Sequence, residues 1–303
     1  MFAAPPVLET TVFATIPKSP KAGTSAWFDM QPGMPPTLGS FIEGPSFDRA
    51  GNLWIVDIPY GRLFRIGPDG DVSLALEYDG WPNGLKFHRD GRAFIADNKH
   101  GIMVFDPATG AIAPHLARGH MERFKGLNDL LFASNGDLYF TDQGDSGLQD
   151  PSGRLYRLRA DGPLEIVLDG LPSPNGLVLS LDEKTLYLCV TRDNAVWRVP
   201  LMPGAPPTKV GAFIRLSGGV GPDGIAIDEA GNLAVCHPGL GSVWLFSPVG
   251  EPLYRIKSQT GPVTTNCAYG GAGGKALFIT ESITGTVLQA QLPVAGKAMF
   301  SHT

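Results

Sequence analysis

Cysteine is scarce in this chain of 303 residues, and several signatures of common protein classes are missing. The three cysteines have no metal-binding spacing, so we expect them to be small core residues. The six histidines show neither HxxxH nor HExxH spacing, which leaves no recognisable zinc site. A GxSxG sequence is also absent, which argues against a serine hydrolase.

The chain also lacks a strong excess of one charge, and it lacks long apolar runs. The formal net charge is −5 and the pI is about 5.7, so the chain has no electrostatic footprint for nucleic acid. No Lys/Arg run suggests a membrane surface, and no apolar stretch is long enough to span a bilayer. The N-terminal sequence MFAAPPVLETTVFATIP has no basic segment and is broken by prolines, unlike a signal peptide. We therefore predict a cytoplasmic protein without nucleic-acid or membrane partners.

Glycine and proline are abundant, and sustained helical periodicity is absent. Instead, six segments align on one polar residue, and each continues as turn and strand, as in the turn DRAGN before LWIV. The aligned residues, which we call the anchors, are Glu43, Asn83, Asn128, Asn175, Asp223 and Asn266. Strand repeats of roughly 45 residues are typical of propeller blades.

The repeat predicts an all-β fold, a six-bladed β-propeller with four-stranded antiparallel blades, in a single domain over residues 1–303. The β-rich segment 10–16 lies outside the six units. We expect it to pair with residues 286–292 in the last blade, so that an N-terminal strand closes the ring. Residues 18–42 are rich in proline and glycine and are predicted to form a rim or lid loop.

A closed ring would bring the anchors around one axis. Glu43, Asn128, Asn175 and Asp223 could then supply four side-chain oxygens to a hard cation. Two of them are carboxylates, which offset one divalent charge, so we predict Ca²⁺, with Mg²⁺ or Mn²⁺ also compatible. None of the anchors is a Cys or a His, which argues against zinc and copper. The alternative is that Asn-Gly and Asp-Gly are only turn dipeptides, which explains some anchors but not six polar ones.

Several motifs, taken in order, are similar to a known family. They are Glu43-Gly44-Pro45, Asn128-Asp129-Leu130, Tyr139-Phe140-Thr141-Asp142, Pro174-Asn175-Gly176-Leu177 and Pro222-Asp223-Gly224-Ile225. Over residues 40–290 the chain resembles the senescence marker protein/gluconolactonase/luciferin-regenerating enzyme-like family. The resemblance implies a six-bladed propeller with a divalent cation, usually calcium, in its tunnel. It also implies hydrolysis of lactones and, in a related branch, of organophosphate esters.

In the terms of that family, Glu43, Asn175 and Asp223 match direct metal ligands, and Asn128 matches a ligand that binds directly or through water. Sugar-lactone members often have an Arg two residues before the third-blade Asn. This chain has Gly126 there, preceded by Lys125, which leaves simpler aliphatic or aromatic lactones open.

A mechanism follows from a cation that polarises the lactone carbonyl. Asp223 is the first candidate for the base or nucleophile, and Asp129 is the second. The alternative for Asp129 is a carboxylate that orients Asn128 or binds backbone amides.

Five residues are candidates for substrate binding. Trp81 and Phe124 could form apolar pocket walls, and Lys125 lies beside Phe124. Asn83 could hydrogen-bond the substrate or support a neighbouring ligand. His237, at the end of a strand, could contact substrate or shuttle a proton, or be a loop histidine.

The sequence therefore predicts a metal-dependent lactonase, a carboxylic ester hydrolase whose partner is a small lactone or ester. One alternative is a phosphotriesterase or arylesterase on the same site, since both reactions need a polarised oxygen and a nearby carboxylate. The other is a non-catalytic metal-binding propeller scaffold, because a fold does not fix a function.

Overall fold

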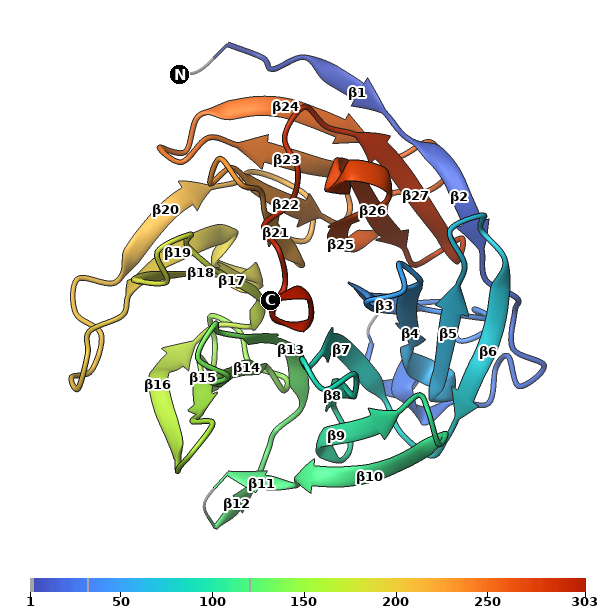
Figure 1. Ribbon diagram of the computed structural model, residues 1–303, viewed down its shortest axis with the longest axis horizontal. Coiled ribbons are helices and arrows are strands. Elements are labelled where there is room, and N and C mark those ends of the chain that lie inside the picture. The colour runs from blue at the N-terminus through green and yellow to red at the C-terminus, as the bar shows by residue number, and fades with distance from the viewer. Residues whose placement is uncertain (1–2, 32, 120) are drawn as a thin grey trace.

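Six antiparallel sheets stand like blades around one central axis (Figure 1). This computed structural model describes residues 3–31, 33–119 and 121–303. Each blade begins with an inner strand at the axis and continues outward strand by strand (Figure 1). The six-bladed β-propeller expected from the repeat is confirmed.

The first four blades each use four consecutive strands. Blade one contains β3 (Ile42–Phe47), β4 (Leu53–Asp57), β5 (Arg62–Ile66) and β6 (Val72–Glu77). Blade two contains β7 (Pro82–Phe87), β8 (Ala93–Asp97), β9 (Gly101–Asp106) and β10 (Ala111–Leu116). Blade three contains β13 (Leu127–Phe132), β14 (Leu138–Asp142), β15 (Gly153–Leu158) and β16 (Leu164–Leu171). Blade four contains β17 (Pro174–Leu179), β18 (Thr185–Val190), β19 (Ala195–Pro200) and β20 (Gly211–Arg215). A small hairpin, β11 (Arg118–Gly119) and β12 (Glu122–Arg123), links blades two and three.

The N-terminal segment closes the ring. Blade five contains β21 (Ile225–Ile227), β22 (Leu233–His237), β23 (Ser242–Phe246) and β24 (Pro252–Lys257). Blade six contains β25 (Thr264–Gly270), β26 (Ala276–Glu281) and β27 (Thr286–Gln291), and its outer strand is β2 (Thr11–Thr15). Because β2 pairs antiparallel with β27, the predicted closure is confirmed. The preceding strand β1 (Val7–Glu9) adds a parallel fifth strand beside β24, which the sequence did not predict.

Hydrophobic clusters fill the spaces between adjacent blades. One cluster joins blades six and one around Phe47 and Phe278, and another joins blades one and two around Trp54. The cysteines are free and buried: Cys189 packs between blades four and five, and Cys236 and Cys267 pack between blades five and six. The predicted core role of the cysteines is therefore confirmed.

Helical structure is limited to short 3₁₀ turns in the part of the chain that the structure describes. They are η1 (Ala26–Met30), η2 (Ile58–Tyr60), η3 (Thr191–Asp193), η4 (Ala272–Gly274) and η5 (Phe300–His302). Among these residues, no helix has the length and apolar character needed to cross a membrane.

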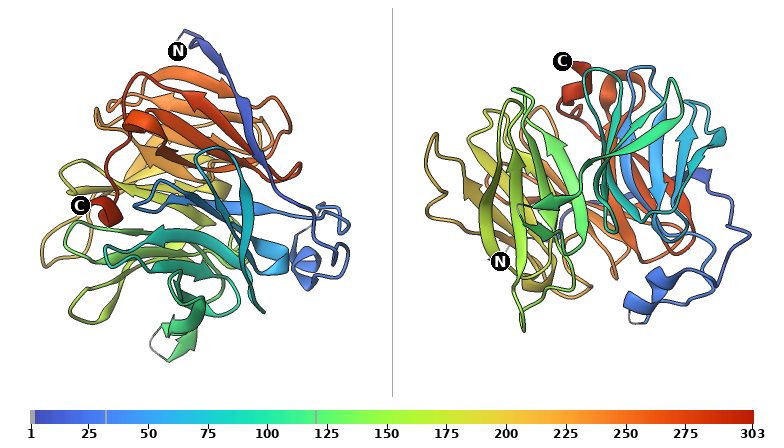
Figure 2. Two further views of the ribbon diagram at one scale, coloured as in Figure 1. Left: turned by 45° about the vertical axis from the view of Figure 1, so that its right-hand side comes forward. Right: turned by 90° about the horizontal axis from the view of Figure 1, so that it is seen from below.

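Two segments lie on opposite faces of the ring. Residues 18–42 contain η1, whose Trp27 and Phe28 pack with Phe41, Ile58 and Tyr60. The C-terminal segment ends in η5 near the axis, on the other face (Figures 1 and 2). We call these the lid face and the tail face.

Irregular pairing of the inner strands occurs where the anchors lie. The register between the inner and second strands shifts between Glu43 and Ser46, between Leu127 and Leu130, and between Pro174 and Leu177. Equivalent shifts occur beside the anchors of blades two and six. In blade five the inner strand starts only at Ile225, after its anchor. Since a bulge re-aims a side chain, these irregularities free the anchors from the regular in-and-out alternation of a strand.

Candidate metal centre and active site

Anchors from separate blades meet at the hub of the ring. The Nδ2 atom of Asn266, on β25, donates hydrogen bonds to Oε2 of Glu43 at 2.9 Å and to Oδ2 of Asp129 at 3.3 Å. These contacts join blades six, one and three, whose residues lie 223 and 137 positions apart in the chain. All three side chains are buried. We call this group, together with Asp223, Asn175 and Asn128, the hub.

Backbone amides hold the hub side chains in place. Glu43 accepts a hydrogen bond from the Gly44 amide at 2.7 Å. The side chain of Asp129 accepts one from Leu130 at 2.8 Å, and that of Asn266 accepts one from Cys267 at 2.8 Å. In blades one, three and six, the anchor or its neighbour thus accepts a hydrogen bond from the next backbone amide, which the bulge has freed from strand pairing. The hub is therefore preorganised by the backbone.

The glycines after two anchors are required by close packing. A Cβ atom at Gly84 would lie 2.5 Å from Oδ1 of Asp129, and one at Gly224 would lie 2.2 Å from Oδ1 of Asn266. Only glycine lets neighbouring inner strands approach this closely. The Asn-Gly and Asp-Gly steps are thus packing sites within the inner strands rather than turn dipeptides.

The amide of the anchor Asn128 is also oriented. Nδ2 of Asn128 donates to Oε1 of Gln143 at 3.0 Å, and Nε2 of Gln143 donates to Oγ of Ser173 at 2.8 Å. These hydrogen bonds fix the amide of Asn128 and leave its oxygen as the atom that could bind a cation. The side chain of Asn175 lowers the pKa of Asp223, which places the two groups close together. Gln143 was missed in the sequence, where it directly follows β14 (Leu138–Asp142).

Three carboxyl groups, those of Glu43 and Asp129 buried and that of Asp223 partly buried, make the hub electrostatically unfavourable on its own. Burial, with a contribution from Asp129, raises the pKa of Glu43 to about 7. Burial raises the pKa of Asp129, and burial with the charges of Glu43 and Asp129 raises the pKa of Asp223 far above its ordinary value. Bound positive charge at this point would relieve the repulsion.

The donor atoms suit a hard divalent cation. No three His, Cys, Asp or Glu side chains form a metal-binding group among the residues described. The predicted set of Glu43, Asn128, Asn175 and Asp223 is of another kind, since two of its four members are amides. Carboxylate and amide oxygens are the ligands that calcium takes in proteins. The residues present therefore fit the expected ion.

Comparison with known proteins agrees with this arrangement. The profile of the SMP-30/Gluconolactonase/LRE-like region matches residues 41–283. The chain belongs to this family. It is 32% identical over 274 residues to a gluconolactonase of Zymomonas mobilis, covering 79% of this chain and 76% of that protein. It is 33% identical over 230 residues to lactonase drp35 of Staphylococcus saprophyticus, covering 72% and 70%.

A solved structure shows the same fold. The calcium-binding protein regucalcin of Agrobacterium tumefaciens superposes with a TM-score of 0.75 at 23% identity, over 97% of this chain and 99% of that one. At 23% identity, this superposition supports the fold of the present chain and nothing beyond the fold.

Two candidate substrate residues belong to blade two. Trp81 is half-buried, its amide donates to Asp97 at 3.0 Å, and it lines a pocket between blade two and the lid residues Lys21, Ser25 and Ala26. The side chain of Asn83 is also partly buried, at the bulge of β7. Trp81 therefore lies on the lid face, as a substrate contact would require, and its role stays a prediction.

Phe124 and Lys125 lie between blades two and three. Phe124 packs edge-on against Phe140 and Tyr156, with ring centroids 5.5 and 5.4 Å away, and it lines a shallow pocket beside Asn98. Lys125 is exposed, and its amide donates to Asp142. Phe124 thus has a packing role whatever it does for a substrate.

His237 is buried, and both of its ring nitrogens have partners. Nε2 lies 2.9 Å from the carbonyl oxygen of Gly218, and Nδ1 accepts a hydrogen bond from Nε1 of Trp244 at 3.3 Å. Burial lowers its pKa, which favours the neutral ring. This arrangement favours the structural reading, and a substrate contact stays a prediction.

Arg192 was not singled out from the sequence. It lies in η3, directly after β18, and its side chain is exposed. Its positive charge lowers the pKa of Asp223, which places it within electrostatic reach of the hub. Arg192 lies two residues past the second strand of blade four, and Gln143 lies one residue past the second strand of blade three.

Stability without metal should fall as the pH rises. The ordinary pKa of Glu43 is 4.5 and its folded value is about 7, so between these values the folded state holds a proton that the unfolded state has lost. Stability from Glu43 is therefore present below pH 4.5 and is lost towards pH 7, by about 3 kcal/mol. Thermal unfolding in chelator between pH 5 and 8 would measure this loss. Saturating Ca²⁺ should reduce the slope, and Glu43→Gln should make it shallower; a rise in stability with pH in chelator would contradict the prediction.

Proposed function

We propose that this protein is a metal-dependent lactonase that opens the ring of a small lactone. The observation that carries the proposal is at the hub, where the amide of Asn266 contacts carboxyl groups of Glu43 and Asp129 from two other blades, and their charges raise the pKa of Asp223 beyond the effect of burial. Homology to a gluconolactonase and a lactonase supports the reaction class. The calcium-binding regucalcin within the same fold supports the choice of ion.

Each hub residue has a role in this proposal. Glu43, Asn128, Asn175 and Asp223 would hold the cation, which when bound supplies Lewis-acid polarisation of the lactone carbonyl. Asp223 takes the proton from the attacking water or attacks the carbonyl carbon itself. In the metal-free protein burial and the charges of Glu43 and Asp129 raise its pKa, and a bound cation would favour the ionised carboxylate that accepts a proton.

Asp129 is better placed to position other groups. One of its oxygens accepts from the Leu130 amide and the other from Asn266, so both are engaged within the protein. This arrangement supports the reading in which Asp129 orients the hub, and it leaves Asp223 as the stronger candidate for proton transfer.

The position of the missing arginine supports substrates simpler than sugar lactones. A Cβ atom at Gly126 would lie 2.4 Å from Nδ2 of Asn98, so the neighbouring blade occupies that space. Candidate side chains for substrate include Trp81 and Phe124, which line two pockets, and the exposed cations Lys125 and Arg192. Two aromatic rings and two cations suit an aliphatic or aromatic lactone whose carbonyl oxygen needs polar contacts.

A hydrolysis panel tests the proposal. Purified protein is stripped with chelator and assayed by acid release on γ-, δ- and sugar lactones, then again after addition of Ca²⁺, Mg²⁺ or Mn²⁺. We expect ring opening only after metal return, with γ- or δ-lactones preferred. An aryl ester and an organophosphate triester in the same panel test the phosphotriesterase and arylesterase alternative. If no substrate is cleaved with any metal, the proposal is wrong and the scaffold reading stands.

A further inference from the structure

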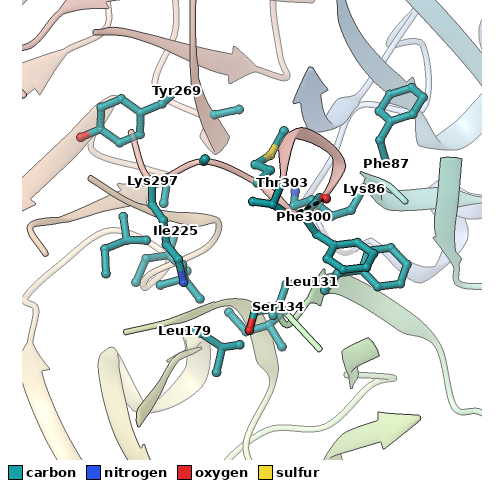
Figure 3. Close-up of a pocket in the computed structure, with 18 of the residues that line it drawn as sticks. Lys86, Phe87, Leu131, Ser134, Leu179, Ile225, Tyr269, Lys297, Phe300 and Thr303 are labelled. Carbon is teal, nitrogen blue, oxygen red and sulfur yellow. Dashed lines mark hydrogen bonds between the residues drawn. The ribbon is translucent and has the colours of Figure 1, made fainter. Parts of the chain in front are cut away.

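A second cavity lies at the tail face of the ring, under the C-terminal segment (Figure 3). The ring of Phe300 stacks on Phe132, with centroids 5.2 Å apart, and the guanidinium of Arg89 lies 4.2 Å from the Phe300 centroid. The carbonyl oxygen of Ser301 accepts a hydrogen bond from Nε of Arg49 at 2.5 Å. The tail is therefore fastened to blades one, two and three.

The cavity beneath the tail is small and mostly apolar. Its volume is about 170 Å³. Inner strands of several blades and the tail supply its walls, which include Phe87, Leu131, Leu179, Ile227 and Met299. A cavity of roughly 150 Å³ with similar walls accommodates benzene, so this one suits a ligand of about six to nine non-hydrogen atoms.

Charged side chains of both signs line the cavity. Two lysines and one glutamate line it together with Thr303, the last residue of the sequence, and Figure 3 shows Lys86 and Lys297 on different sides. Nζ of Lys297 lies 3.3 Å from Oε1 of Glu183 and 3.3 Å from the carbonyl oxygen of Ser180. Lys86 is half-buried, and no carboxylate in the described chain lies within 4.0 Å of its ammonium group. Lys86 is therefore the cavity lysine without a carboxylate partner.

Asp129 does not supply the missing partner. The charge of Lys86 lowers the pKa of Asp129, so the two groups interact electrostatically. However, the carboxylate oxygens of Asp129 are bound by Leu130 and Asn266 at the hub. A charge in partly apolar surroundings is normally paired. An anion on the cavity side of Lys86 would complete the site.

We propose that this cavity binds a small monocarboxylate with an apolar body, aliphatic or aromatic, with its carboxylate on Lys86 and its body against Leu131, Leu179 and Phe300. The ammonium group of Lys86, which has no carboxylate partner, selects one anionic group, and the apolar walls favour a hydrocarbon over a phosphate or a sugar acid. The site is separate from the hub, so the proposal does not depend on lactone hydrolysis.

Hexanoate is a suitable probe, because it has eight non-hydrogen atoms. Calorimetric titration of the full chain in chelator at pH 8 keeps metal away from the hub, where a carboxylate could otherwise bind. We expect a dissociation constant of about 1 mM or lower, and at least tenfold weaker binding of 1-hexanol. Lys86→Met, which keeps the length of the side chain, should weaken hexanoate at least tenfold and hexanol little. Lys275→Met, at an exposed lysine outside the cavity, is the matched control and should bind as wild type.

The location is tested without any variant. A hexanoate analogue carrying a diazirine should crosslink to peptides that contain Leu131, Leu179 or Phe300, and excess hexanoate should suppress the labelling. The proposal fails if hexanoate does not bind at 10 mM, on the order of tenfold above the expected constant. It also fails if hexanol binds as tightly as hexanoate, or if the label falls only on lid-face peptides.

Discussion

Asp223→Asn should reduce lactone hydrolysis by about 10³-fold or more at saturating metal and at the same time stabilise the metal-free protein. The first effect follows because an amide cannot accept the proton of the attacking water, and loss of a general base costs roughly 10²–10⁴-fold. The second follows because Asp223 is partly buried at the hub, and this burial, together with the charges of Glu43 and Asp129, raises its pKa. Replacing one of three repelling carboxyl groups with a neutral group of the same shape removes that repulsion.

The two effects are measured separately. Hydrolysis is followed in increasing Ca²⁺ until the rate no longer changes, which separates lost chemistry from weakened metal binding. Thermal unfolding in chelator at pH 8 gives the second effect. Asp169→Asn, at an exposed position on β16, is the matched control and should change neither quantity. Full activity at saturating Ca²⁺ would remove Asp223 from the mechanism, and a lower melting temperature in chelator would contradict the electrostatic account of the hub.

The architecture could be predicted because each unit of the sequence repeat corresponds to one blade. The second strand of every blade starts ten residues after its anchor, at Leu53, Ala93, Leu138, Thr185, Leu233 and Ala276. The closing pair of β2 with β27 was predictable because segment 10–16 was the one β-rich segment left outside the units. The parallel pairing of β1 with β24 was not, since three residues carry no periodic signal.

The hub was predicted in part for the same reason. The alignment of the anchors identifies positions that lie at the axis, but it does not show which way each side chain points. The hydrogen bonds of Asn266 to two carboxyl groups on other blades depend on the bulges, which have no single-residue signature. Gln143 and Arg192 lie just past second strands, outside the aligned column, so only the fold brings them near Asn128 and Asp223.

Arg62→Met should destabilise the protein by about 3–5 kcal/mol, because it leaves a buried carboxyl group without its partner. Arg62 and Asp57 are both buried, and Nε of Arg62 lies 2.8 Å from Oδ2 of Asp57. The pair also holds the lid. Arg62 donates to the carbonyl oxygen of Gly39 at 3.2 Å, and Asp57 accepts from the Phe41 amide at 2.7 Å. These contacts fix the chain just before Glu43, so the affinity for Ca²⁺ should fall as well.

The pH dependence identifies the cause. Burial raises the pKa of Asp57 to about 6 even though Arg62 opposes this shift, and without Arg62 the pKa should be higher still. The folded variant can then hold a proton on Asp57 at pH 5, so the loss of stability should be small there and grow as the pH rises past 6. Denaturant unfolding of wild type and Arg62→Met at pH 5 and pH 8 measures the difference. Adding Asp57→Asn to Arg62→Met should recover part of the loss at pH 8, since no unpaired charge remains. A loss that is equal at both pH values would show that Arg62 acts through packing on Tyr60 and Phe64 rather than through its charge.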